Sequence, residues 1–191
     1  PITRASVSIW NSQRLAYELA AAVSTAIGET GAPGPVFLEI PTDVLRESVA
    51  YYPISKDACS VSILKNQSPD PKDVSRAVDM LWNASRILVI SGRGARGAGH
   101  GLRKLLDATG GLYLDTQESR GLVPEEHSSV VSAVRGAAMR EADLVVTIGR
   151  KLDYQLGYGS PAVFPKARFL RIGDNMDELR DGRRGDGELL G

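Results

Sequence analysis

Cysteine and histidine are scarce in this sequence. The chain of 191 residues contains one cysteine, Cys59, and two histidines, His100 and His127. A single cysteine cannot form a disulfide within the chain, which is typical of a cytoplasmic protein. The histidines and the cysteine lack the spacing of a metal site, and neither histidine has a nucleophile or an acid placed to complete a catalytic triad. The residue pattern therefore predicts no metal ligand and no catalytic residue within the chain.

An excess of charge and long apolar runs are also lacking. Lysine plus arginine and aspartate plus glutamate both number 23, so the formal net charge is zero. Nucleic acids and anionic membranes attract proteins with a basic excess, which this chain does not have. No run of about 18 apolar residues, the length of a membrane-spanning helix, occurs. We therefore expect neither a nucleic acid nor a membrane as a partner.

Residues 1–45 predict one helix followed by one strand. Asn11 or Ser12 can cap a helix over 12–28 that ends at Gly28, with an apolar face formed by Leu15, Leu19, Val23 and Ile27. The apolar segment 36–40 is a predicted strand that stops at Pro41. One strand cannot bury itself, so we expect its partners to come from elsewhere, and we expect the helix to pack on a second copy or on the rest of the chain.

Residues 70–191 predict a second domain, separated from the first by a linker at 46–69 that lacks periodicity. Apolar strands are expected at 87–90, 112–115, 144–148 and 168–172. Helices alternate with them, and the first has a predicted buried face of Val74, Ala77, Val78, Leu81 and Trp82. This alternation is typical of an α/β fold with a doubly wound, Rossmann-like parallel sheet of about six strands.

A glycine-rich turn follows the first of these strands. The segment Gly92-Arg93-Gly94-Ala95-Arg96-Gly97 matches G-x-G-x-x-G, and Asp115 ends the next strand where a dinucleotide fold places its ribose-binding acid. Such glycines let the backbone approach a pyrophosphate at a helix N-terminus. A turn of this kind also suits the fold without a ligand. Both interpretations stay open, and a stand-alone adenine-nucleotide or NAD(P)-binding module is the alternative function.

Charged residues of both signs are interleaved near the C-terminus. Arginines alternate with aspartates here, which predicts a mixed, solvated surface composed of Arg171, Arg180, Arg183, Arg184, Asp174, Asp177, Asp181 and Asp186. The segment Gly185-Asp186-Gly187 is similar to the start of a Mg²⁺–diphosphate motif. No asparagine follows it, so we do not interpret it as a metal site.

Several segments, in their order along the chain, resemble thiamine diphosphate-dependent enzymes of the acetolactate synthase, oxalyl-CoA decarboxylase and benzaldehyde lyase type. The segment at 34–44 is similar to the family pattern G-P-V-x-(L/I)-x-(I/L)-P-x-D-V, which closes the pyrimidine-binding domain. The segments that are similar to the family's central domain are 87–94, Thr116, 120–127, 142–149 and 168–179. The resemblance thus identifies 1–45 as the end of a pyrimidine-binding domain and 70–191 as a central domain.

The resemblance implies that the chain is one part of a larger lyase, decarboxylase or carboligase acting on 2-oxo acids or related acyl substrates. In this family thiamine diphosphate and Mg²⁺ are bound between the pyrimidine-binding and diphosphate-binding domains of different subunits. The residues that hold them are expected outside this chain, so the chain alone should be inactive. Its partners would be those two domains and further copies of the protein, in a dimer or a tetramer.

The resemblance also implies that FAD, ADP or the nucleotide part of CoA can bind the central domain. The matching positions are Gly92, Arg93, Gly94, Ala95, Thr116, Gln117, Gly149, Arg150 and Asp174. FAD-binding members have G-x-R-F-D-D-R where this chain has Tyr154 and Gln155 in place of the second Asp and the last Arg. Members with I-D-I-D have acids where this chain has Gly173 and Asn175. These departures remove partners for an adenosine ribose and argue against FAD.

Overall fold

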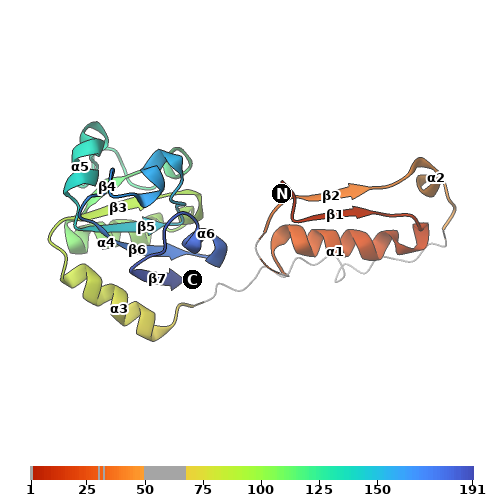
Figure 1. The fold of residues 1–191 in the computed structure, drawn as a ribbon, viewed down its shortest axis with the longest axis horizontal. Coiled ribbons are helices and arrows are strands. Elements are labelled where there is room, and N and C mark those ends of the chain that lie inside the picture. The colour runs from red at the N-terminus through yellow and green to blue at the C-terminus, as the bar shows by residue number, and fades with distance from the viewer. Residues whose placement is uncertain (1, 30, 32, 50–67) are drawn as a thin grey trace. The chain divides into compact units, whose positions relative to one another are not determined.

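The structure, a computed structural model, describes residues 2–29, 31, 33–49 and 68–191, and for Gln117 only the backbone. The chain divides into two compact units, Pro1–Lys65 and Asn66–Gly191, each of which is described by itself (Figure 1). Cys59 and most of the expected linker lie outside the described residues.

The first unit is a two-stranded parallel sheet with one helix packed on it. Strand β1 (Ala5–Ser8) pairs with β2 (Val36–Glu39), with Ala5 opposite Val36. The short helix η1 (Ser12–Arg14), capped by the Asn11 side chain, leads into α1 (Leu15–Ile27), and α2 (Thr42–Leu45) follows β2. The expectation of a single strand in residues 1–45 was wrong, because β1 is a second strand and pairs with β2.

The buried face of α1 differs from the predicted one. Ala22 is its buried residue, whereas Leu19 and Val23 are 46% and 41% exposed. Because an α-helix has 3.6 residues per turn, each step of four residues advances about 40° past a full turn. A row spaced by four from Leu15 to Ile27 therefore winds around the helix, and a two-stranded sheet is too narrow to cover all of it. Gly28 ends the helix at φ +90°, as predicted.

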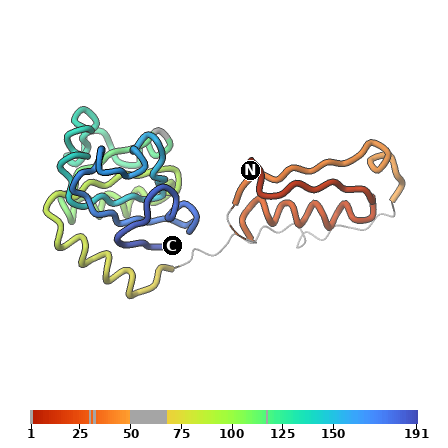
Figure 2. The backbone as a smooth tube through the Cα atoms, in the orientation of Figure 1, coloured from red at the N-terminus to blue at the C-terminus, as the bar shows by residue number. Residues whose placement is uncertain are grey.

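The second unit contains the predicted doubly wound α/β fold. Five parallel strands lie in the order β4-β3-β5-β6-β7, and they are β3 (Ile87–Ser91), β4 (Leu112–Leu114), β5 (Leu144–Ile148), β6 (Arg168–Gly173) and β7 (Gly187–Leu190). The backbone tube in Figure 2 follows the alternation of strands and helices to the C-terminus. The strand order reverses between β3 and β5, which is where such sheets open a crevice at their carboxyl edge.

The sheet has five strands in the described part of the chain, where about six were expected. A sixth segment beside β4 forms one parallel bridge, between Tyr113 and Val130. The Tyr113 N–H donates to Ser129 O at 2.7 Å, and the Val131 N–H donates to Tyr113 O at 3.2 Å. The chain then enters the 3₁₀ helix η5 (Ser132–Val134), which ends the pairing after one residue.

Two apolar cores cover the two faces of this sheet. One packs α3 (Pro71–Trp82) and α4 (Gly99–Thr109) on Val89 and Val146. The other packs α5 (Arg135–Glu141) and η6 (Tyr154–Gly159) on Ile90 and Val145. Alternate residues of each strand thus enter opposite cores, and Figure 1 shows α3 and α5 on opposite sides of the sheet.

The predicted buried face of α3 was partly wrong. Ala77 and Met80 are buried, but Val74 and Val78 are exposed and Trp82 is 84% exposed. The exposed row again advances in steps of four, whereas Ala77 and Met80 follow the mixed spacing of three and four that keeps side chains on one face. Asp70 caps the helix through Lys72 N at 2.8 Å, and Pro71 is its first residue, as expected.

Candidate functional site

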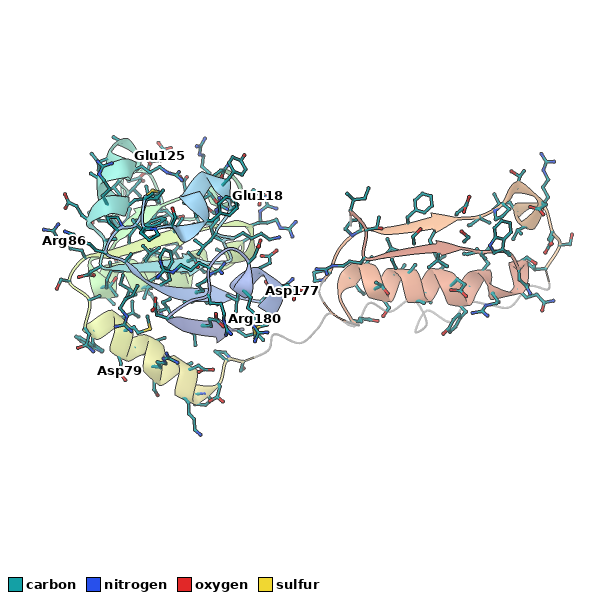
Figure 3. All side chains as sticks on the ribbon, in the orientation of Figure 1. Asp79, Arg86, Glu118, Glu125, Asp177 and Arg180 are labelled. Atoms are coloured by element: carbon teal, nitrogen blue, oxygen red, sulfur yellow. The ribbon has the colours of Figure 1, made fainter. Side chains whose placement is uncertain are left out.

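A polar cavity of about 450 Å³ lies where β3 and β5 end, at the carboxyl edge of the sheet. Four predicted site residues line it: Arg93, Thr116, Gly149 and Arg150. The other lining residues are Glu118, Lys151, Asp153, Gln155 and Glu178. In Figure 3, Glu118 and Asp177 lie at this carboxyl edge, and Arg86 lies at the opposite edge.

The glycines beneath the cavity are required by contacts within the protein. Strand β3 ends in the 3₁₀ helix η3 (Arg93–Ala95), which packs directly on the turn after β5. A Cβ on Gly94 would lie 2.8 Å from Gly149 Cα, and a Cβ on Gly92 would lie 2.8 Å from Arg150 Cα. Gly149 has φ +54°, and its Cβ would lie 2.5 Å from Ala95 N. These glycines allow two turns to touch, which is the interpretation that needs no ligand.

Backbone N–H groups of the same turn are used internally. Gly92 N donates to Ile148 O at 2.9 Å, and Gly94 N donates to Gly149 O at 3.1 Å. Ala95 N and Arg96 N donate to Gly92 O and Arg93 O. Helix α4 begins only at Gly99, and the N–H of Leu102 already bonds to Ala98 O. In the turn itself, the N–H groups of Gly92 and of Gly94 to Arg96 are therefore not available to a pyrophosphate, unlike those of a dinucleotide-binding turn.

Arg150 is the most buried cation of the cavity, with 9% of its side chain exposed. Its two terminal nitrogens donate to both carboxylate oxygens of Asp153, at 2.8 and 3.0 Å, and one of them also donates to Gln155 Oε1 at 3.0 Å. Hydrogen bonding from Arg150 holds the pKa of Asp153 below its ordinary value. The Nε of Arg150 is buried and has no hydrogen-bond partner among the described residues, so it is an unsatisfied donor without accessible surface in the cavity.

The other charges of the cavity differ in how they are paired. Lys151 Nζ lies 3.3 Å from Glu178 Oε1. In the part of the chain that the structure describes, Arg93 and the side chain of Glu118 have no ion-pair partner, and Arg93 is exposed. An exposed arginine whose donors are free can bind phosphate or hydroxyl oxygens.

Sequence reasoning missed a network of hydroxyl groups below the cavity. The Ser91 hydroxyl is 2.6 Å from the Tyr113 hydroxyl and donates to Ser119 Oγ at 2.9 Å. Thr116 Oγ1 donates to Ser91 O at 2.8 Å, so this predicted site residue is already engaged. Burial raises the pKa of Tyr113 above its ordinary value. Serines and a tyrosine within apolar strands were the available signal, since a buried hydroxyl needs a partner.

The remaining predicted residues do not enter the cavity. Gly92, Gly94 and Ala95 lie in the turn beneath it, and Asp174 is exposed and outside its lining. Asp115 lies 3.6 Å from Arg120 in an ion pair. Of Gln117 only the backbone is described, in η4 (Gln117–Ser119).

The two histidines lie apart from the cavity. His100 is an exposed residue of α4. His127 Nδ1 accepts from Ser129 N at 3.2 Å, so Nε2 carries the proton and donates to Asp107 at 3.2 Å. Both ring nitrogens of His127 are thus occupied in holding its loop to α4.

The expectation of a solvated surface near the C-terminus was wrong for Arg171. This residue lies in β6 and is completely buried. Its guanidinium donates to Leu179 O, and to the carbonyls of Glu178, Asp181 and Arg183 at 2.7, 2.9 and 2.7 Å. Burial lowers the pKa of Arg171, although nearby carboxylates oppose this. The carbonyls at the end of α6 (Met176–Arg180) replace water as its acceptors.

Asp186, in the Gly185-Asp186-Gly187 segment, has a structural role. Its carboxylate accepts from Phe169 N at 2.8 Å, and its N–H donates to Phe169 O at 2.7 Å. In the described part of the chain, no three or more His, Cys, Asp or Glu side chains form a group that could hold a metal ion. These residues therefore do not fit Mg²⁺ with thiamine diphosphate.

Among the described helices, none is long and apolar enough to cross a membrane.

Comparison with known proteins adds a family and relatives. Residues 74–191 match the family model described as "Thiamine pyrophosphate enzyme, central domain". A 2-hydroxyacyl-CoA lyase of Oryza sativa subsp. japonica is 31% identical over 186 residues, which cover 91% of this chain and 31% of the relative. The oxalyl-CoA decarboxylase of Escherichia coli K12 is 27% identical over 191 residues, covering 96% of this chain and 33% of the relative.

A solved structure shares the fold. It is described as that of a thiamin diphosphate-dependent enzyme from Mycobacterium smegmatis, and it aligns with a TM-score of 0.72 at 19% identity over 100% of this chain and 37% of the other. The chain spans about a third of the length of the curated relatives named above.

Proposed function

The chain belongs to the thiamine pyrophosphate enzymes through a central domain at residues 74–191, and from this membership we propose that it is part of a lyase or decarboxylase that acts on CoA thioesters. Relatives of both kinds, a 2-hydroxyacyl-CoA lyase and an oxalyl-CoA decarboxylase, match almost the whole chain. This match is the observation that carries the proposal. It does not favour the alternative of a stand-alone NAD(P)-binding module.

We further propose that residues 1–45 end the pyrimidine-binding domain and that the protein is a cytoplasmic homo-oligomer. The apolar residues of α1 that remain exposed, Leu19 and Val23, support a partner for this unit, because such residues are usually covered in a complete domain. Thiamine diphosphate, held by residues outside those described, would supply the nucleophile and the electron sink for the carbon–carbon bond step. The described residues contribute no group to that step.

For the cavity of the central domain we propose an adenine nucleotide as the ligand: ADP, or the equivalent part of CoA. Its volume of about 450 Å³ is in the range of small-molecule sites. The exposed guanidinium of Arg93 can hold phosphate oxygens, in place of the backbone donors that the glycine turn uses internally. The exposed Tyr154 and the engaged Gln155, which stand where FAD-binding members have Asp and Arg, support a nucleotide smaller than FAD.

Calorimetric titration with ADP, CoA, FAD and NAD⁺ tests the ligand. We expect ADP or CoA to bind, and Arg93→Gln to weaken the binding about tenfold through the loss of one charge-assisted hydrogen bond. Arg140→Gln, an exposed residue of α5 outside the cavity, is the matched control and should leave the affinity unchanged. Tighter binding of NAD⁺ than of ADP would restore the dinucleotide interpretation.

Turnover by the full-length protein, with thiamine diphosphate and Mg²⁺ added, tests the substrate class. We expect consumption of a 2-hydroxyacyl-CoA or of oxalyl-CoA. Consumption of free 2-oxo acids, with CoA thioesters left intact, would contradict the proposed substrate.

A further inference from the structure

The cavity needs an acceptor for the ribose of an adenine nucleotide, and the usual positions lack one. The family acids after this strand are replaced by Gly173 and Asn175. Asn175 instead caps α6 by accepting from Asp177 N at 2.9 Å, and Asp174 is exposed outside the cavity lining. None of these three positions therefore brings a carboxylate into the cavity.

Glu178 provides a carboxylate on the same side of the cavity. It comes from α6, directly after β6, and it lines the cavity. Its Oε1 pairs with Lys151 at 3.3 Å, and no hydrogen bond or ion pair occupies its Oε2 in the described part of the chain. A carboxylate accepts hydrogen bonds from a ribose hydroxyl, as the acidic residue of dinucleotide-binding folds does.

Arg171 fixes the backbone that carries Glu178. From β6, one terminal nitrogen of its guanidinium donates to Glu178 O at 2.7 Å. The other donates to the carbonyls of Leu179, Asp181 and Arg183. Its planar fork spans the end of α6 and the turn that follows, which a single ammonium group cannot do.

We infer that Glu178 is the ribose-binding residue of the cavity and that Arg171 is its positioning residue. This inference rests on the proposed nucleotide site. Arg171, which is charged and buried, thereby acts on the cavity through the main chain of Glu178, the residue that contacts the ligand. The chain thereby recognises the ribose hydroxyls, rather than the adenine ring, through a charged side chain.

The test compares the affinities for ADP and 2′-deoxy-ADP by calorimetry, using the full chain. We expect the wild-type protein to prefer ADP about tenfold, the loss that follows removal of one hydrogen bond to a charged group. Glu178→Gln should reduce this preference severalfold, and Arg171→Lys should reduce it similarly. In the double variant, Arg171→Lys should add no further change, because it acts through Glu178.

The outcomes separate the inference from the proposed site. No binding of ADP by the wild-type protein would refute the nucleotide site itself. Binding of ADP with no preference over 2′-deoxy-ADP would overturn the role of Glu178 and leave the site standing. If Arg171→Lys only destabilised the protein in general, it would weaken the binding of ADP and of 2′-deoxy-ADP equally and leave the ratio of the two affinities unchanged. That result would overturn the positioning role.

Two measurements remain decisive if Arg171→Lys fails to fold. Glu178→Gln changes a partly exposed side chain and still reports the ligand contact. Arg171→Ala refolded with millimolar guanidinium tests the positioning role, since the free cation can fill the vacated space. We expect the added ion to restore folding and the preference for ADP together. Restored folding without the preference would contradict positioning by Arg171.

Discussion

Alanine substitutions in the glycine-rich turns would show whether these glycines serve packing or a ligand. Gly149→Ala combines two costs. Its φ of +54° lies in the left-handed region, which costs a side chain about 1–2 kcal/mol. Its Cβ would meet the backbone of Gly94 and Ala95, and forcing atoms into filled space costs about 1–3 kcal/mol. We expect a loss of about 2–5 kcal/mol, a large part of a typical unfolding free energy of about 5–15 kcal/mol.

Three further glycines separate these two costs. Gly97 has φ +90° but open space around it, so Gly97→Ala should cost only the conformational part, about 1–2 kcal/mol. Gly92 has φ −135° and backbone in the way of a Cβ, so Gly92→Ala should cost only the steric part, about 1–3 kcal/mol. Gly101 lies in α4 with nothing near its Cβ, so Gly101→Ala should stabilise by about 0.5–1 kcal/mol.

Urea unfolding followed by far-UV circular dichroism measures these free energies, with the slope checked for constancy among variants. Nucleotide affinity is measured on the same proteins under conditions where each is folded. If Gly92→Ala left the unfolding free energy within about 0.5 kcal/mol of the wild type and abolished nucleotide binding, the packing argument would be refuted. The turn would then be a phosphate site after all.

Four other substitutions test separate parts of the second unit. Tyr113→Phe should cost about 1 kcal/mol through the lost hydrogen bond. Because burial raises the folded-state pKa of this tyrosine, the unfolding free energy of the wild type should fall as the pH rises above 10.0. A series of denaturation measurements in which the unfolding free energy of the variant falls equally would contradict this. Asp153→Asn should cost about 1–2 kcal/mol at neutral pH by unpairing the buried Arg150. Because the folded-state pKa of Asp153 is lowered, its contribution is present above 3.8 and should disappear as the pH falls through the depressed value, a loss absent in the variant's acid titration. In thermal or urea unfolding, Met80→Ala should cost about 2–5 kcal/mol because Met80 is buried. Trp82→Ala should cost less than about 0.5 kcal/mol because Trp82 is exposed. Equal costs would support the buried face of α3 that was predicted from the sequence.

Much of the candidate site could be located from the sequence, because strand ends fix its position. Parallel strands bring the residues after their carboxyl ends to one edge, so Arg93, Thr116, Gly149 and Arg150 could be grouped from their spacing and the family resemblance. Glu178 was not among them, because it reaches the cavity from a helix rather than from a strand end. The unused Nε of Arg150 also depends on where Asp153 and Gln155 fold back, which no local pattern states.

The sequence by itself determined the alternation of strands and helices between residues 70 and 172, the parallel doubly wound sheet and the helix ends at Asp70 and Gly28, because periodicity, caps and glycine conformations are local properties. The tertiary structure alone decided which face of a helix is covered, since that depends on how wide a neighbouring layer is. It also decided that Arg171 is buried in a segment that reads as charged surface. A buried guanidinium is stable only where acceptors replace water, and here four carbonyls do so, from the end of α6 and the turn after it, whose path is set by the packing of α6 against β6.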